Sequence, residues 1–329
     1  MLNYENERRV AIEAVIKACL LCQRIREKNF FDEAIEKQDK SPVTVADFTS
    51  QAVISQYLIN AFPNDPIAAE ERLADLRTDL RENIIFKVKS IFSDLSEDQI
   101  LANIDRCDYQ GGTSGRFWAL DPIDGTKGFI RGDQYAIALA LIEDGEVVLG
   151  VLGCPNLPYN LNHPKESKGC LLVAVKGQGS RMRLIEDPAE MTIKVAEVED
   201  PAAALLCESI EPAHSSHNHS AQIAKILGVK SPPFRIDSQC KYGIVARGDA
   251  TIYLRVPGKS GYEEKIWDHA AGWLIVKEAG GEVTDIHGYP IDFSTGRTLS
   301  KNKGIVATNG KLHDQVLSAV RKVLRAEEK

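Results

Sequence analysis

Hydrophobic residues at helical spacing begin the chain. From Glu5 to about Asn29 they recur every three or four positions, which predicts a long amphipathic helix. A polar loop over 37–47 follows, and Phe48–Ala61 predicts a second helix. Asp47 stands at the start of that helix, where a carboxylate can cap exposed N–H groups, so capping alone could explain it.

Two short apolar runs then end in acidic residues. Ile67–Ala69 predicts a strand that is followed by Glu70, and Phe117–Leu120 predicts a strand that is followed by Asp121 and Asp124. Pro122 and Gly125 are expected to stop the second strand at Leu120. Residues 72–110, between the two runs, are charged and helix-prone and predict a peripheral helical insertion.

Alternating segments predict hairpins after the acidic turn. Residues 135–143 and 146–153 are joined by Asp144-Gly145, a strong hairpin signal, and 171–175 pairs with 182–184 around 176–179. We expect one antiparallel sheet between about 67 and 195, with the first two helices packed on it. The N-terminal half is thus predicted to be α+β.

Strands alternate with helices beyond Asp200-Pro201. The clearest helix is Trp267–Ala279, stopped by Gly280-Gly281, and a last helix is expected over Leu312–Arg325. This half predicts a mixed α/β domain. The expected division is 1–195 and 196–329, with a boundary near 190–202.

Composition narrows the class of protein. The 329 residues are 43% hydrophobic and 26% charged, with a net charge of −7, which argues against a nucleic-acid-binding surface as the main function. No stretch approaches the ~20 apolar residues that span a bilayer. The N-terminus, with Glu5 and Arg8, lacks a signal-peptide core, so we expect a cytoplasmic protein without a membrane partner.

The cysteines predict reduced thiols. They number seven and are scattered along the chain, which does not suggest a disulfide framework. Cys19 and Cys22 form a C-x-x-C, but they lie within the first helical pattern, so buried helix positions are favoured over a redox or zinc site.

The segment 118–128 carries the strongest chemical signal. Asp121 and Asp124 lie close together on a stiff turn, which costs electrostatic repulsion unless a cation lies between them. The turn offers hard oxygen donors and no His or Cys, which favours Mg²⁺ over Zn²⁺. Gly125, Thr126 and Gly128 could begin a short helix whose N–H groups face a phosphate. The alternative is a simple capped turn, because Asp-Pro and Asp-Gly are common in loops.

A second signal, 264–272, places Asp268 in the first turn of a helix, where capping is again the alternative. Taken in order, Asp47 after 41–44, Glu70 after a strand, the 121–126 turn and Trp267-Asp268 resemble the Mg²⁺-dependent, lithium-sensitive phosphomonoesterases related to inositol monophosphatase. Within that superfamily, 121–132, 153–157 and 265–272 look most like the 3′(2′),5′-bisphosphate nucleotidases, as do the substrate-contacting stretches 214–217 and 237–242. One departure is Ala69, where the family usually has glycine.

The resemblance implies a layered αβαβα sandwich and a set of site residues. Glu70, Asp121 and the Ile123 carbonyl would hold one Mg²⁺, and Asp121, Asp124 and Asp268 a second, with a third ion near Glu70 and Asp47 also conceivable. Asp47 and Thr126 would form a catalytic relay in which Asp47 accepts the Thr126 hydroxyl proton and Thr126 activates the attacking water. The expected substrate contacts come from Gly125, Thr126, Ser215, His217, Ser238, Lys241 and Arg255. For Arg255, ordinary solvated surface charge is an equal alternative.

The expected activity is removal of the 3′-phosphate of 3′-phosphoadenosine 5′-phosphate to give AMP, by direct attack of water. Its 5′-phosphosulfate analogue and inositol 1,4-bisphosphate are further candidate substrates, and Li⁺ and Na⁺ are candidate inhibitors. The alternatives are an inositol (poly)phosphate 1-phosphatase and, in another class, a non-catalytic nucleotide or cation sensor. The partner is expected to be a small molecule, and the oligomeric state is left open with a monomer preferred.

Overall fold

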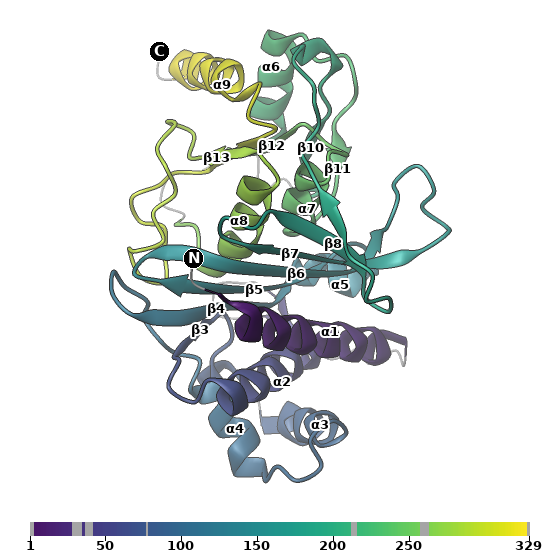
Figure 1. The fold of residues 1–329 in the computed structure, drawn as a ribbon, viewed down its shortest axis with the longest axis vertical. Helices are drawn as coiled ribbons and strands as arrows, with labels where there is room; N and C mark the ends of the chain where they lie inside the picture. Colours follow the sequence, from purple (N-terminus) through teal and green to yellow (C-terminus); the bar gives the residue numbers. More distant parts are fainter. Residues whose placement is uncertain are drawn as a thin grey trace.

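The computed structural model describes residues 3–27, 35–36, 42–76, 78–211, 216–256 and 263–327. Helices and sheets alternate in layers, and the seven-stranded sheet in the middle of Figure 1 separates α1 and α2 from α7 and α8. A five-stranded sheet follows, and α6 and α9 cover its outer face. The predicted αβαβα sandwich is confirmed. The helices of these layers are α1 (Glu5–Glu27), α2 (Val45–Ala61), α6 (His217–Leu227), α7 (Cys240–Ala246), α8 (Ala270–Glu278) and α9 (His313–Glu327).

The larger sheet has the order β3-β4-β5-β6-β7-β8-β9. All its pairings are antiparallel except that of β3 with β4, so the prediction of an antiparallel sheet is wrong only at this edge. The tight turn between β5 and β6 contains Asp144 and Gly145, both with positive φ, as the Asp-Gly signal predicts. The strands are β3 (Ile67–Ala69), β4 (Arg116–Asp124), β5 (Ala136–Glu143), β6 (Glu146–Pro158), β7 (Lys168–Val175), β8 (Ser180–Leu184) and β9 (Met191–Ile193).

Strand β4 does not stop at Leu120, as the sequence had suggested, but continues through Pro122 to Asp124. Its pairing with β5 passes from Asp121↔Ala138 to Asp124↔Ala136, so β4 contains one extra residue at this point. Proline is tolerated there because a bulge interrupts the hydrogen-bond ladder. In a regular strand, residues three apart point to opposite faces, and the bulge removes that restriction for Asp121 and Asp124.

The smaller sheet has the order β11-β10-β12-β14-β13 and is mixed, since β10 runs parallel to β11 and β12 while β14 runs antiparallel to β12 and β13. The helix predicted over Trp267–Ala279 is divided into a 3₁₀ turn, Ile266–Asp268, and α8. Asp268 therefore lies just before α8 rather than within its first turn. The strands are β10 (Leu206–Glu208), β11 (Phe234–Arg235), β12 (Ile252–Arg255), β13 (Glu282–Thr284) and β14 (Ile305–Thr308).

The remaining elements are short or peripheral. The predicted helical insertion is present as a 3₁₀ turn (Leu73–Asp75), α3 (Thr78–Lys89) and α4 (Glu97–Asp105), which pack on α2 at the bottom of Figure 1. A two-stranded ribbon, β1 (Ile35–Glu36) with β2 (Pro42–Val43), precedes α2, a 3₁₀ turn (Pro201–Ala203) precedes β10, and α5 (Thr126–Arg131) follows β4.

One continuous apolar cluster includes Ala138 of β5, Leu274 of α8 and Tyr253 of β12, and so joins both sheets. The division at 195/196 stays a prediction. All seven cysteines are buried and unbridged, as expected. Among the described residues, no helix combines the length and apolar character needed to cross a membrane.

Candidate active site

Acidic side chains from distant parts of the chain meet at the end of β4. Asp121 is 2% exposed, and its pKa lies well above the ordinary value. Burial is the largest cause, and the charges of Glu70, Asp124, Asp268 and Asp47 add to it in that order. The structure therefore brings together all the carboxylates that the sequence nominated for metal binding and catalysis.

Positive charges lie near two carboxylates of the cluster, Asp124 and Asp268. Burial raises the pKa of Asp124 to about 6. Lys241, the Gln239 N–H and Arg255 oppose that rise in pKa. The Gln239 N–H donates to Oδ2 of Asp124 at 2.5 Å. The acidic cluster thus faces basic groups of the C-terminal half.

The donors at this site fit a hard divalent cation. The cluster contains buried carboxylates whose mutual repulsion disfavours ionisation, and a cation between them would remove that cost. The potential ligands are carboxylate oxygens and the Ile123 carbonyl, which is the donor set that Mg²⁺ prefers. The burial of Asp121 and the partial exposure of Asp124 and Asp268 leave one side of the cluster accessible.

Asp47 and Thr126 are in contact, as predicted for a relay. The hydroxyl of Thr126 lies 3.2 Å from Oδ1 of Asp47 and 3.2 Å from the Ile123 carbonyl. Oδ2 of Asp47 accepts the Thr44 N–H at 2.8 Å and the Thr44 hydroxyl at 2.6 Å, within the capping box of α2. Capping and the Thr126 contact thus use different oxygens, so the two explanations of Asp47 are compatible.

Two of the expected substrate residues, Lys241 and Arg255, lie near this cluster. Lys241 is 5% exposed, its Nζ donates to the Ile236 carbonyl at 3.4 Å, and burial lowers its pKa while Asp124 opposes that shift. Arg255 lies 3.7 Å from Asp268 and is 11% exposed in its side chain, which argues against a solvated surface charge. Both are therefore part of the site.

The turn at Gly125 packs against the turn at Ser238. Ser238 has φ 66° and Gly125 has φ 85°, and a Cβ on Gly125 would lie 3.0 Å from that of Ser238. The Nε2 of His217 lies 2.9 Å from the Ser209 carbonyl. Ser215 lies outside the described residues.

Sequence reasoning gave no role to Gln239 or Glu264, although both lie in the stretches that carry the resemblance. The side chain of Gln239 donates to the Trp267 carbonyl at 2.8 Å and accepts the Gly272 N–H at 3.1 Å. Glu264 holds Arg255 with two contacts, at 2.9 and 2.7 Å, and lies 3.0 Å from Nε2 of His269. Burial alone would raise the pKa of Glu264, but Arg255 and His269 lower it to about 2.

Ligand atoms of Glu264, Asp268 and His269 lie within 4.8 Å of one another. Glu264 is already paired with Arg255, and both ring nitrogens of His269 have partners, since Nδ1 lies 2.8 Å from the Tyr242 hydroxyl. We interpret this group as support for Asp268 rather than as a separate metal site.

A model of the inositol monophosphatase family matches residues 3–325. The chain belongs to the inositol monophosphatase family. Among curated relatives of this family member, the "3′(2′),5′-bisphosphate nucleotidase" of Emericella nidulans is 46% identical and covers 98% of this chain and 100% of its own. The "3′(2′),5′-bisphosphate nucleotidase 1" of Arabidopsis thaliana is also 46% identical, over 99% of this chain and 98% of its own.

Solved structures agree on the inositol monophosphatase fold. The Thermotoga maritima IMPase aligns with a TM-score of 0.66 and 23% identity, covering 96% of each chain. The inositol monophosphatase from Anabaena aligns with a TM-score of 0.62 and 21% identity, covering 98% of this chain and 97% of its own. At these identities the structural match establishes the fold alone.

The departure at Ala69 is compatible with the backbone of this inositol monophosphatase family member. Ala69, where glycine was expected, lies in β3 and is not among the described residues with positive φ, so alanine causes no backbone strain there.

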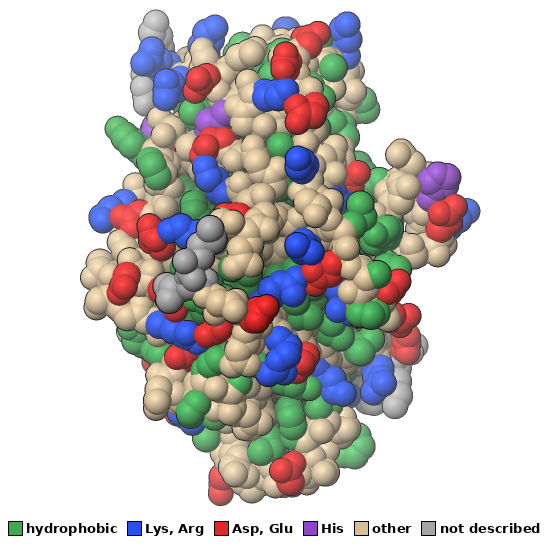
Figure 2. Space-filling model, in the orientation of Figure 1, with side chains coloured by type: hydrophobic (Ala, Val, Ile, Leu, Met, Phe, Trp, Pro, Cys, Tyr) green, Lys and Arg blue, Asp and Glu red, His purple; other side chains and the backbone are tan. Residues whose placement is uncertain are grey.

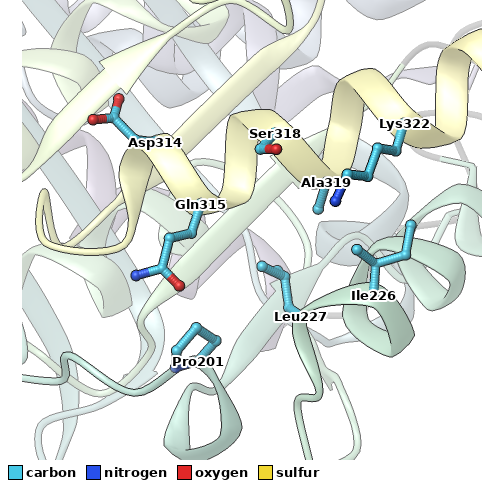
Figure 3. A pocket seen from close by; sticks show the side chains of 8 residues that line it. All are labelled: Pro201, Ile226, Leu227, Asp314, Gln315, Ser318, Ala319 and Lys322. Atoms are coloured by element: carbon cyan, nitrogen blue, oxygen red, sulfur yellow. The ribbon is translucent and has the colours of Figure 1, made fainter.

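The cavity of about 400 Å³ in Figure 3 lies between Leu227 at the end of α6 and Ala319 of α9, and none of the predicted site residues lines it.

Lys and Arg side chains are interspersed with Asp and Glu on the face in Figure 2, so the described residues form no continuous basic area there. Such mixing is unlike the basic stripes that follow a nucleic-acid backbone.

Proposed function

We propose that this protein is a Mg²⁺-dependent 3′(2′),5′-bisphosphate nucleotidase that converts 3′-phosphoadenosine 5′-phosphate to AMP. The observation that carries the proposal is the buried acidic cluster around Asp121, with Lys241 and Arg255 at its edge. A site that combines carboxylates for metal with cations for a second phosphate suits a substrate bearing two phosphates. The names of the curated relatives support the same substrate class.

The proposed metal ligands are those of the cluster. Glu70, Asp121 and the Ile123 carbonyl would hold one Mg²⁺, and Asp121, Asp124 and Asp268 a second, with a third near Glu70 and Asp47. When bound, the ions would neutralise charge on the phosphoryl oxygens and increase the acidity of water. The number of ions, and inhibition by Li⁺ or Na⁺, belong to this proposal.

Asp47 and Thr126 are the proposed catalytic pair. Because Asp47 accepts the Thr126 hydroxyl proton, a lone pair of Oγ1 is available to accept a proton from the attacking water. As water attacks the 3′-phosphorus, its proton would pass through Thr126 toward Asp47. The P–O3′ bond breaks, and O3′ would leave with the bonding electron pair and take up a proton from solvent. No covalent enzyme intermediate is required.

Substrate binding is proposed for Gly125, Thr126, His217, Ser238, Lys241 and Arg255, together with Ser215. Lys241 would contribute most to the second phosphate, because its ammonium is buried and close to Asp124. The 5′-phosphosulfate analogue and inositol 1,4-bisphosphate are further proposed substrates. A cytoplasmic monomer completes the proposal.

The test is phosphate release from 3′-phosphoadenosine 5′-phosphate, inositol 1-phosphate and inositol 1,4-bisphosphate, with Mg²⁺, with Mg²⁺ and Li⁺, and with chelator. We expect Mg²⁺-dependent, Li⁺-inhibited turnover of the nucleotide that D121N abolishes. K241M should raise KM for the nucleotide by about tenfold or more and change that for inositol 1-phosphate little, since a buried charge-assisted contact contributes about 1.5–3 kcal/mol. Turnover of inositol phosphates alone would support the 1-phosphatase instead. Nucleotide binding without turnover would support the sensor.

A further inference from the structure

The guanidinium of Arg297 lies between segments that are distant in sequence. Its side chain is 9% exposed. It donates to the carbonyl of Ala69, which lies 228 positions away, to that of Tyr109 at 3.1 Å and to that of Cys107 at 3.4 Å. Its Cζ also lies 4.5 Å from the centroid of the Trp267 ring. One side chain therefore contacts both the β3 segment and the segment before α8.

The backbone around Arg297 makes the same connection. The Ile266 N–H donates to the Arg297 carbonyl at 3.1 Å, and the Leu299 N–H donates to the Glu264 carbonyl at 2.8 Å. On the other side, Gly296 packs closely on Gly111, where a Cβ on Gly111 would lie 3.0 Å from the Gly296 carbonyl carbon. The loop 294–299 is thus held between 107–111 and 264–266.

Two of the residues that Arg297 contacts, Ala69 and Trp267, directly precede proposed metal ligands. Ala69 immediately precedes Glu70, and Trp267 immediately precedes Asp268. We infer that Arg297 is a positioning residue that sets the spacing between Glu70 and Asp268, which are assigned to different Mg²⁺ ions. The inference rests on the proposed function, because it concerns the same metal site.

Arginine suits this task for geometric reasons. Its planar guanidinium carries five N–H donors in a fixed arrangement, so it can bind several carbonyls at its edge while its face stacks on an indole ring. The ammonium of lysine is a single point and cannot reproduce both contacts. The carboxylate of Asp108 is 3.7 Å away and 66% exposed, so the carbonyls and the ring provide most of the surroundings of the buried cation.

The chain offers a matched control in Arg247. Its side chain is 3% exposed, pairs with Asp249, and donates to the carbonyls of Pro158 at 2.8 Å and Tyr159 at 3.4 Å. It resembles Arg297 in burial and in bonding to distant backbone, but it does not contact either metal-ligand segment in the described structure. Comparing R297K with R247K therefore separates metal positioning from general destabilisation.

The experiment titrates the full-length protein with Mg²⁺ alone, measures binding by calorimetry and by the Mg²⁺-dependent rise in unfolding temperature, and then measures the Mg²⁺ dependence of turnover. R297K should weaken Mg²⁺ binding by about 10-fold or more, the usual effect of losing a group that orients metal ligands. R247K should lower the unfolding temperature and leave Mg²⁺ affinity within about twofold of the wild type. Unchanged affinity in R297K, or an equal loss in R247K, would overturn the inference.

A second variant covers the case in which R297K does not fold. G296A keeps the guanidinium but strains its loop, because Gly296 has φ 99° and a Cβ there would lie 3.1 Å from the Gln110 carbonyl oxygen. Weaker Mg²⁺ binding in G296A supports the inference, and unchanged binding overturns it. Failure of the proposed function is a different result, since the wild type itself would then lack Mg²⁺-dependent nucleotide turnover.

Discussion

The N–H of Gln239 donates to Oδ2 of Asp124 at 2.5 Å and so joins β4 to the residue before α7, 115 positions away. The same residue uses its side-chain amide to bind the Trp267 carbonyl and the Gly272 N–H, on either side of Asp268. Gln239 therefore links two of the proposed ligands of one metal ion. Ser238, the residue before Gln239, has φ 66°.

Q239A is expected to destabilise the protein by about 1–3 kcal/mol, because it leaves buried groups at 267 and 272 without their partner. It should also weaken Mg²⁺ binding, which calorimetric titration measures alongside urea unfolding. Q178A, at an exposed turn position, is the matched control and should stay within about 0.5 kcal/mol of the wild type. A Q239A protein with wild-type stability and metal affinity would contradict the assigned role.

T126V should lower kcat by about 10²–10⁴-fold, since it removes the hydroxyl between Asp47 and the attacking water while conserving side-chain volume. T126S, which keeps a hydroxyl, should retain most activity. T49V is the control for a buried threonine in α2, whose hydroxyl donates to the Val45 carbonyl, and it should leave kcat nearly unchanged. Steady-state kinetics at saturating Mg²⁺ measure all three, and a fully active T126V would refute the relay.

D121N is expected to raise the free energy of unfolding of the metal-free protein at pH 7 by about 1–2 kcal/mol. Residues that serve function commonly lower stability by this order. The substitution replaces a buried carboxyl whose ionisation the neighbouring like charges disfavour, and it keeps an oxygen that can accept the Ile123 N–H. Thermal unfolding in chelator measures the gain. D65N provides the opposite control, since Asp65 accepts from Arg116 at 2.8 Å and from Trp118 at 3.0 Å, and its loss should destabilise. A metal-free D121N less stable than the wild type would contradict the expected repulsion.

The pH dependence follows from Asp124, whose pKa is raised from 3.8 to about 6 in the folded, metal-free protein. A raised carboxyl pKa contributes stability that is present below about pH 4, the unfolded value, and is lost as the pH rises through 6. Mg²⁺ binds the ionised form, so the stabilisation that Mg²⁺ provides should increase over the same interval. Unfolding temperatures with and without Mg²⁺ at pH 5 and pH 7.5 test this. An equal Mg²⁺ effect at both values would exclude Asp124 as a titrating ligand.

Local signals were sufficient for most of the elements and for nominating the acidic residues that the structure brings together. Asp144-Gly145 predicted its hairpin because tight-turn geometry depends on neighbouring residues. The acidic residues at strand ends were recognised as a group because their types and order match one family. The end of β4 was placed wrongly, because proline and glycine usually stop a strand and a bulge that accommodates Pro122 has no comparable local signature.

The sequence by itself determined which residues could bind metal and activate water, since donor type and turn chemistry are properties of short segments. Tertiary structure alone decided how these residues are held. Gln239 bonds to Asp124, 115 positions away, and Arg297 to Ala69, 228 positions away, while Glu264 bonds to Arg255 at the end of β12. No periodicity or spacing encodes such contacts, because a hydrogen bond between distant segments depends on where the whole fold brings them.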